Sequence, residues 1–350
     1  MTKGDLPREL LASTLAPEAD LSETLRWGIA HACAAPSELN SQPWRFSVVM
    51  TAEGTEATVE LLLDESRRLD AIDPDGREAR LACGAALLNL RLALRGAELG
   101  TRVVTCPDRA RPELLARLTV KGTASEPVAD RLLRLAIRDR STHRGAFIPG
   151  LVQDDVVDQL VAEAAYEGAV VVVIRAADRG AMDDLTAEAE QQLWLEPAYR
   201  REVAAWSRPN GSRRTDGVPG FAHDLVGWRS WLQPTLIRSG RVESPDIEDV
   251  RAIEGAPLLL VVGSASDSPD ALVRAGAGMQ RLLLSARTQG LAASYLNAAL
   301  HVPELRRELG RLVELDHPQV VLRVGYAAPD RPTSRRHESA VLDLQMPPPP

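Results

Sequence analysis

Two long stretches of the chain are apolar on nearly every helical face. Apolar residues fill most positions between Gly76 and Leu99, and Val273–Gln289 has a similar composition. A helix without a polar face is buried on all sides. The sequence therefore predicts two central core helices, each enclosed by other elements.

The surroundings of these two stretches follow the same order. The first is preceded by a helix (21–35) and strands at Phe46–Met50 and Val59–Asp64, and is followed by a strand at Thr101–Thr105. Gly100 is expected at the C′ position of the first core helix. The second is preceded by a helix from Asp154 or Asp155 to Ala165 and strands at 169–174 and 257–262.

The ends of the two core helices also align. RLALRGAELG (91–100) and RLLLSARTQG (281–290) share Arg, two Leu and the final Gly. Chance similarity of two leucine-rich helices explains this alignment equally well. The shared order of elements favours an internal duplication.

Composition and charge exclude several classes of protein. The 350 residues carry a net charge of −8, which argues against binding to nucleic acid or an anionic membrane. No apolar run approaches the roughly 20 residues of a membrane helix, and residues 1–20 lack the apolar core of a signal peptide. Cys33, Cys83 and Cys106 are odd in number and widely spaced, as in reduced thiols. We expect a soluble cytoplasmic protein.

Common catalytic motifs are absent from the sequence. RAGAGMQR (274–281) lacks the third glycine of a dinucleotide fingerprint, and no phosphate loop or nucleophile elbow is found. The six histidines have no metal-ligand spacing and no Cys pair is close, so no metal site is expected. No pair of carboxylates suggests a general acid and base, and a cofactor is therefore expected to carry any reaction.

The two halves differ in their polar loops. Only the first half contains APSELNSQPWRF (35–46), which concentrates proline, amide and hydroxyl groups. Only the second half begins with RDRSTHRGAF (138–147). Its arginines and hydroxyls suit a phosphate group, although a solvated helix C-terminus would also favour arginine.

A long segment, 196–243, interrupts the second half. It is rich in Gly, Pro and Arg and contains Trp206, Trp228 and Trp231. Irregular segments of this length are lids, binding loops or disordered regions, and the tryptophans favour packing over another part of the molecule. Arg335 and Arg336 follow in a proline-bounded tail, where surface ion pairs are the simpler explanation.

These motifs together resemble the nitroreductase family of FMN-dependent oxidoreductases. Pro36-Ser37-x-x-Asn40-x-Gln42-Pro43-Trp44 matches that family's P-S-x-x-N-x-Q-P-W segment, and Arg140-x-Thr142-x-Arg144 is similar to its R-x-S/T-x-R element. The order of motifs is similar to that of the Acg-like subfamily of actinobacteria. The resemblance spans roughly residues 21–343, with segment 196–243 matching least.

The resemblance implies an α+β, nitroreductase-like fold in which two tandem repeats form a pseudo-dimer within one chain. Each repeat would have a mainly antiparallel sheet packed by helices around its core helix. The expected division is an extension (1–20), a first repeat (21–128), a second repeat (129–343) containing the lid-like segment, and a proline tail (344–350). The pseudo-dimer would be a monomer or would form a further homodimer.

The resemblance also implies one FMN per chain, bound between the repeats, with NAD(P)H as electron donor. The implied cofactor-binding residues are Pro36, Ser37, Asn40, Gln42, Arg140, Ser141, Thr142, Arg144, Gly290, Leu291, Asn297, Arg335 and Arg336. Asn297 stands where relatives carry a glutamate near flavin N5. Trp44 is expected to anchor the core or to contact the flavin. Phe221, Trp228 and Trp231 are expected in the lid.

The expected function is hydride transfer from NAD(P)H through FMN to a small nitroaromatic, quinone or similar conjugated acceptor, with no acid or base required of the protein. Two alternatives stay open: a closed-lid protein that sequesters flavin, and a flavin oxidase or dehydrogenase acting on a biosynthetic intermediate. Packing of Trp228 and Trp231 over the flavin would favour sequestration.

Overall fold

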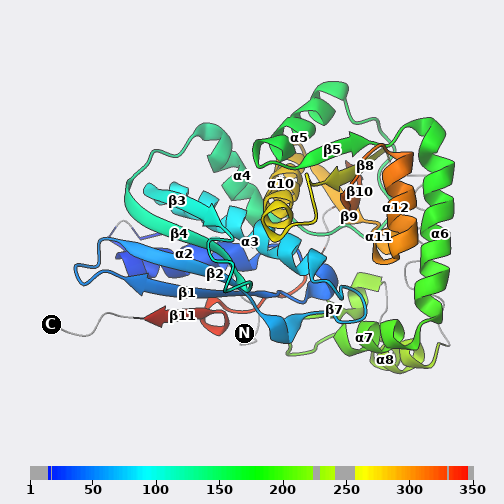
Figure 1. The fold of residues 1–350 in the computed structure, drawn as a ribbon, viewed down its shortest axis with the longest axis horizontal. Coiled ribbons are helices and arrows are strands. Elements are labelled where there is room, and N and C mark those ends of the chain that lie inside the picture. The colour runs from blue at the N-terminus through cyan, green and yellow to red at the C-terminus, as the bar shows by residue number, and fades with distance from the viewer. Residues whose placement is uncertain (1–14, 17, 224–228, 241–256, 329–330, 346–350) are drawn as a thin grey trace.

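A computed structural model describes residues 15–16, 18–223, 229–240, 257–328 and 331–345. Its centre is a pair of long helices, α3 (Arg77–Gly96) and α10 (Pro269–Thr288), with a sheet from each half of the chain (Figure 1). One continuous apolar cluster includes side chains of both helices and both sheets. The two expected core helices are thus confirmed, and they share one core.

The first sheet is formed by β1 (Trp44–Met50), β2 (Ala57–Leu63), β3 (Leu99–Thr105) and β4 (Leu114–Thr123), in the order β1-β2-β4-β3. Helix α2 (Leu21–Cys33) precedes it. Strand β4 was not predicted. The alternation of buried Ala116, Leu118 and Val120 with more exposed residues is the signal that could have identified it.

The second sheet is formed by β5 (Val170–Val173), β8 (Leu258–Gly263), β10 (Pro318–Tyr326) and β9 (Leu291–Tyr295), in that order. Helix α5 (Asp154–Tyr166) precedes it. All neighbouring strands in this sheet are antiparallel, as in β1–β4, and the two orders correspond strand for strand. The α+β fold with two similar halves is therefore as expected, whereas the boundaries 21–128 and 129–343 stay predictions.

The C-terminal strand β11 (Leu342–Gln345) leaves the second half and pairs in parallel with β1 of the first (Figure 1). Its register places Phe46 opposite Leu342 and Val48 opposite Leu344. The short helix η5 (Glu338–Ala340) directly precedes it. This pairing carries residues 331–341 toward the start of β1 and the polar loop before it.

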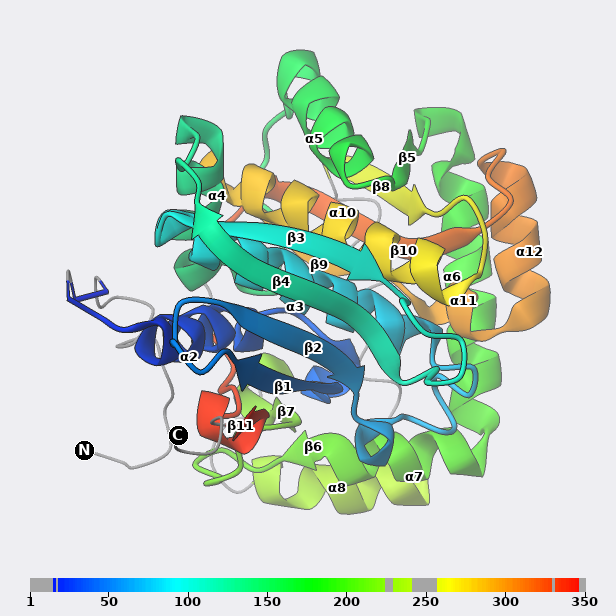
Figure 2. The same ribbon diagram turned by 60° about the vertical axis from the view of Figure 1, so that its left-hand side comes forward.

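Helices α3 and α10 approach each other closely at two glycines. A Cβ atom at Gly84 would lie 2.0 Å from the carbonyl oxygen of Val273, and one at Gly276 would lie 2.0 Å from that of Leu81. Figure 2 shows the two helices together behind β3 and β4. Only glycine allows backbones to come this near.

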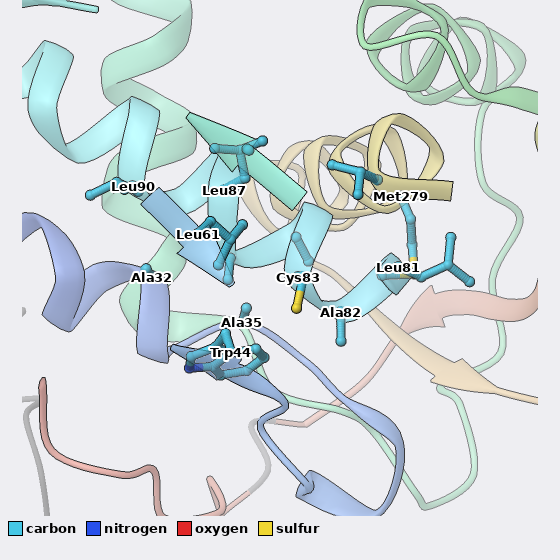
Figure 3. Packing of buried hydrophobic residues seen from close by; sticks show 14 of the residues in the cluster. Ala32, Ala35, Trp44, Leu61, Leu81, Ala82, Cys83, Leu87, Leu90 and Met279 are labelled. Atoms are coloured by element: carbon cyan, nitrogen blue, oxygen red, sulfur yellow. The ribbon is translucent and has the colours of Figure 1, made fainter. Parts of the chain in front are cut away.

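Trp44 anchors the core of the first half. Its side chain is fully buried and lies near Ala35 and Cys83 (Figure 3). Of the two roles expected for Trp44, the structure supports the core anchor.

Further helices are α4 (Val128–Asp139), α6 (Arg179–Leu195), α11 (Ala298–His301) and α12 (Pro303–Leu312). Residues of α6, α11 and α12 pack on the second sheet in a separate apolar cluster. Among the described helices, none combines the length and apolar character needed to cross a membrane.

Two predicted helix ends were wrong by one or two residues. Helix α5 has Gln153 as its N-cap, so neither Asp154 nor Asp155 caps it. After α3 the left-handed residue is Glu98, at φ +58°, and Gly100 lies within β3. A Cβ at Gly100 would meet the carbonyl oxygen of Lys121 at 2.5 Å, so this glycine allows close strand pairing.

The segment predicted as irregular, 196–243, is partly helical. It contains α7 (Pro197–Trp206), the short strands β6 (Ser207–Arg208) and β7 (Val218–Pro219), η4 (Gly220–His223) and α8 (Arg229–Ser239). The prolines made the segment look irregular in the sequence, because proline usually interrupts a helix. Pro197 instead occupies the first turn of α7, where proline is tolerated, and Pro234 lies within α8.

Candidate functional site

The polar loop between α2 and β1 has a strained backbone. Leu39, Asn40 and Gln42 have φ values of +45°, +53° and +54°, a region that non-glycine residues seldom adopt. The Ser37 hydroxyl accepts a hydrogen bond from the Gln42 backbone N–H at 2.9 Å and closes the turn. Strain of this kind persists only where the surroundings fix it, and it is concentrated at functional sites.

The two amide side chains of the loop are bound to distant parts of the chain. Asn40 Nδ2 donates to the carbonyl oxygens of Gly217 at 3.1 Å and Ser334 at 3.0 Å. Gln42 Nε2 donates to Thr215 O at 2.8 Å, and its Oε1 accepts from the Arg336 backbone N–H at 2.7 Å. Asn40 Oδ1 stays buried without a hydrogen-bond partner. The amides therefore fix the loop shape, and this one oxygen is left for another group.

Two arginines from the second half reach the start of this loop. Arg140 Nη2 donates to Ala34 O at 3.3 Å, and Arg335 Nε donates to Ala35 O at 3.2 Å. Pro36 follows directly and is buried. Residues separated by more than a hundred positions in the sequence thus meet at one end of the loop. The structure brings the two predicted halves of the site together.

Arg140 and Arg144 have different environments. Arg140 is buried, whereas Arg144 is exposed. Between them, Thr142 forms a bridge to Ala293 of β9, and the His143 N–H donates to Ala293 O at 2.8 Å. This segment therefore lies along β9, with Arg140 directed inward.

A cavity of about 110 Å³ lies beside Arg140. Ser141, Leu291, Arg287 and Tyr295 also line it. The Tyr295 hydroxyl is buried without a hydrogen-bond partner, and burial raises its pKa to about 12, so it is a neutral donor. Arg287 and Tyr295 were not predicted, because only the fold brings the end of α10 and the end of β9 to this cavity. Gly290 precedes Leu291 at φ +76°.

Arg335 and Arg336 have different roles in the structure. The Arg336 side chain donates to Gln42 O at 3.3 Å and Ala340 O at 2.8 Å, and lies 3.6 Å from Asp64 Oδ2. It therefore holds the loop against the C-terminal segment. Arg335 instead donates to Ala35 O, next to the Ala34 carbonyl that accepts from Arg140.

Asn297 links strand β10 to the first turn of α3. Its Oδ1 accepts from the Val321 N–H at 3.1 Å, and its Nδ2 donates to Glu78 Oε1 at 3.3 Å. The His301 Nε2 atom lies 3.0 Å from the same carboxylate oxygen. One carboxylate oxygen each of Glu38 and Glu78 and one ring nitrogen of His301 all lie within 4.8 Å of one another. The histidine spacing in the sequence gave no sign of this group, whose members come from the loop, α3 and α11.

The segment after α7 is tied to the loop by Asp216. Its carboxylate binds Arg67 at 2.7 Å, Arg214 at 2.9 Å and Arg208 at 3.2 Å. Burial alone would raise the pKa of Asp216, but hydrogen bonds from Arg214 and Arg67 hold it well below its usual range. Arg67 Nε also donates to Ser41 O at 2.5 Å. The inserted segment is thus bound to the polar loop at Thr215, Asp216 and Gly217.

The aromatic residues predicted for the lid differ in their environments. Trp231 is 66% exposed, because α8 buries Ser230, Gln233 and Ile237 and directs Trp231 away from that face. Phe221 lies under Arg331, whose guanidinium carbon is 4.3 Å from the ring centre. Trp228 lies outside the described residues. Trp206 of the same segment contacts Arg67, whose guanidinium carbon is 5.3 Å from its ring centre.

Comparison with known proteins supports a family assignment. The model of the nitroreductase family matches residues 137–326. A Mycobacterium tuberculosis protein named as an NAD(P)H nitroreductase is 30% identical over 328 residues, covering 92% of each chain. The NAD(P)H nitroreductase acg of the same organism is 28% identical over 310 residues, covering 87% of this chain and 90% of its own.

A solved structure shows the same fold over most of the chain. The crystal structure of a nitroreductase from Anabaena variabilis matches with a TM-score of 0.52 and covers 92% of this chain and 91% of its own. The two sequences are 10% identical, so this likeness concerns the fold alone.

Proposed function

Because this chain belongs to the nitroreductase family, we propose that it is an FMN-dependent oxidoreductase that transfers electrons from NAD(P)H to a small conjugated acceptor, with one flavin between its halves. The convergence of Arg140 and Arg335 on Ala34 and Ala35, at the start of the polar loop, carries this proposal. The first half contributes the polar loop and the second half contributes the arginines, so one chain would form one complete flavin site.

The residues present fit the two ends of FMN. Arg140, Ser141, Arg287 and Tyr295 line a cavity whose guanidinium and hydroxyl donors suit a phosphate. Asn40 Oδ1, buried without a partner, is an acceptor suited to a ring or ribityl donor. When bound, FMN would accept a hydride from the dinucleotide and deliver the electron pair to the acceptor. The protein would orient it through the fixed loop.

We expect purified protein to bind about one FMN per chain, since one composite site requires both halves. Flavin absorbance against protein concentration measures this. Anaerobic addition of NADPH or NADH should then bleach the flavin, and a quinone or nitroaromatic should restore its colour. Two flavins per chain would contradict the single composite site. Bound flavin that neither dinucleotide bleaches would contradict the reductase.

A flavin-sequestering protein is the second candidate, favoured by the bonds between the inserted segment and the loop. The carbonyls of Thr215 and Gly217 occupy the amides of Gln42 and Asn40. Asp216 adds an ion pair to Arg67, which also bonds to Ser41 O, and its contacts with Arg208 and Arg214 brace the segment internally. A segment bound this firmly would limit the access of a dinucleotide or acceptor to the flavin.

Asp216→Asn is expected to open this segment, because it removes the charge that holds three like-charged guanidinium groups together. Hydrogen bonds to charged groups contribute about 1.5–3 kcal/mol each, so opening should increase about tenfold or more. Proteolysis near residues 207–219 and the rate of flavin reduction by NADPH are the measurements. Asp316→Asn, at an exposed carboxylate, is the control. Faster proteolysis with an unchanged reduction rate would show that the segment does not limit access.

A further inference from the structure

Glu78 and His301 form a buried ion pair between the two halves of the chain. Their closest atoms are 3.0 Å apart, and their side chains are only 5% and 6% exposed. Glu78 belongs to the first turn of α3, whereas His301 ends α11 in the second half. A pair that spans both halves needs the whole fold to assemble.

This pair borders the polar loop. Glu38, the second residue after Pro36 in that loop, places a carboxylate oxygen within 4.8 Å of the ligand atoms of Glu78 and His301. Glu38 is only partly buried. It therefore connects the enclosed pair with the less buried surface of the loop, where the flavin is proposed to bind.

N–H groups from three residues surround one oxygen of Glu78. Arg77 Nη2 donates to Glu78 Oε1 at 2.9 Å, and Asn297 Nδ2 donates to the same oxygen. His301 Nε2 lies 3.0 Å from it. The lone pairs of this oxygen are therefore engaged by N–H groups, and an imidazole N–H in this position donates a charge-assisted hydrogen bond to the carboxylate.

The charges that face His301 favour its protonated form. Burial lowers the pKa of His301, but Glu78 and then Glu38 outweigh burial and Arg77, and the net pKa is raised. Burial would raise the pKa of Glu78, but His301 and Arg77 lower it to about 2. Both shifts favour the ionised pair, in which His301 holds one proton that it can release.

We propose that the Glu78–His301 pair stores the proton that a quinone-type acceptor needs when it is reduced at this site. The role rests on the proposed flavin reductase. A quinone that becomes a hydroquinone gains two electrons and two protons, and hydride transfer supplies both electrons and one proton. An N–H bond of the imidazolium breaks as its proton moves to Glu38, and the Glu38 O–H bond then breaks as the second O–H bond of the hydroquinone forms. His301 then recovers a proton from solvent by way of Glu38.

His301→Gln tests this role in the FMN-loaded protein. After anaerobic reduction with dithionite, we expect reoxidation by benzoquinone to slow about 100-fold, the usual loss when a positioned acid is removed. Reoxidation by ferricyanide, which takes up electrons without protons, should change less than about twofold by the same principle. Glu78→Gln should slow the benzoquinone reaction too, and His317→Gln, at a half-exposed histidine, should not.

A second measurement does not require the cofactor. NMR titration of the His301 ring in the flavin-free protein should give a pKa above the usual 6.5 of histidine, and Glu78→Gln should lower it. A His301 pKa below 6.5, or equal slowing of both acceptors in His301→Gln, would overturn the proton store while leaving the flavin reductase standing. Failure to bind FMN would overturn the reductase and this role together.

Discussion

Arg140→Ala is expected to weaken FMN binding by about 100-fold while changing riboflavin binding less than about threefold, because a hydrogen bond to a charged group contributes about 1.5–3 kcal/mol. Arg140 is buried beside the cavity, and riboflavin lacks the phosphate that its guanidinium would bind. Titration of the flavin-free protein by flavin fluorescence gives both dissociation constants.

Arg144→Ala is the matched control, because Arg144 lies four positions after Arg140 in the same segment but is exposed. The resemblance alone implied equal roles for Arg140 and Arg144, whereas the structure assigns the inner position to Arg140. We therefore expect Arg144→Ala to change FMN affinity by less than about threefold, as surface charge contacts do. Equal losses of FMN and riboflavin in Arg140→Ala would show that this arginine serves Ala34 and the loop, not the phosphate.

The residues of the loop were predictable from sequence, but their contacts were not. The spacing of Pro36, Ser37, Asn40 and Gln42 identified the loop. The side chains of Asn40 and Gln42 bond to Thr215, Gly217 and Arg336, which are between 173 and 294 positions away. The residue pattern of a short segment does not show which distant residues its side chains will bond to. The positive φ values of Leu39, Asn40 and Gln42 were equally hidden, since none of them is glycine.

The same limit explains the two groups that were missed. Glu78 and His301 are 223 positions apart, and Arg287 and Tyr295 lie 147 and 155 positions after Arg140, with which they line one cavity. The expectation that the protein needs no acid or base rests on the fact that no carboxylate pair stands out in the sequence, and it stays a prediction. By contrast, both core helices were predicted correctly. A helix that is apolar on all faces must be buried, and that pattern can be read from a short segment of sequence.

The crossing of those helices is the contact on which the composite site depends. At Gly84 and Gly276 each helix lies against the backbone of the other. This contact sets the position of α3, and hence of Glu78, relative to α10 and the second half. We therefore expect the polar loop and the arginines to meet only if this spacing is kept.

Gly84→Ala is therefore expected to lower the free energy of unfolding by about 4 kcal/mol, at the upper end for a single substitution. The new methyl group would lie 2.0 Å from Val273 O, and backbone atoms on a packed helix cannot move aside as a flexible side chain can. Urea denaturation followed by circular dichroism measures the loss.

Gly180→Ala in α6 is the control, since nothing lies within 4 Å of its added Cβ. Helix propensity alone should make that variant about 0.5–1 kcal/mol more stable. A loss below about 1 kcal/mol in Gly84→Ala would mean that the helices can separate at little cost, and the composite site would then not depend on their close approach.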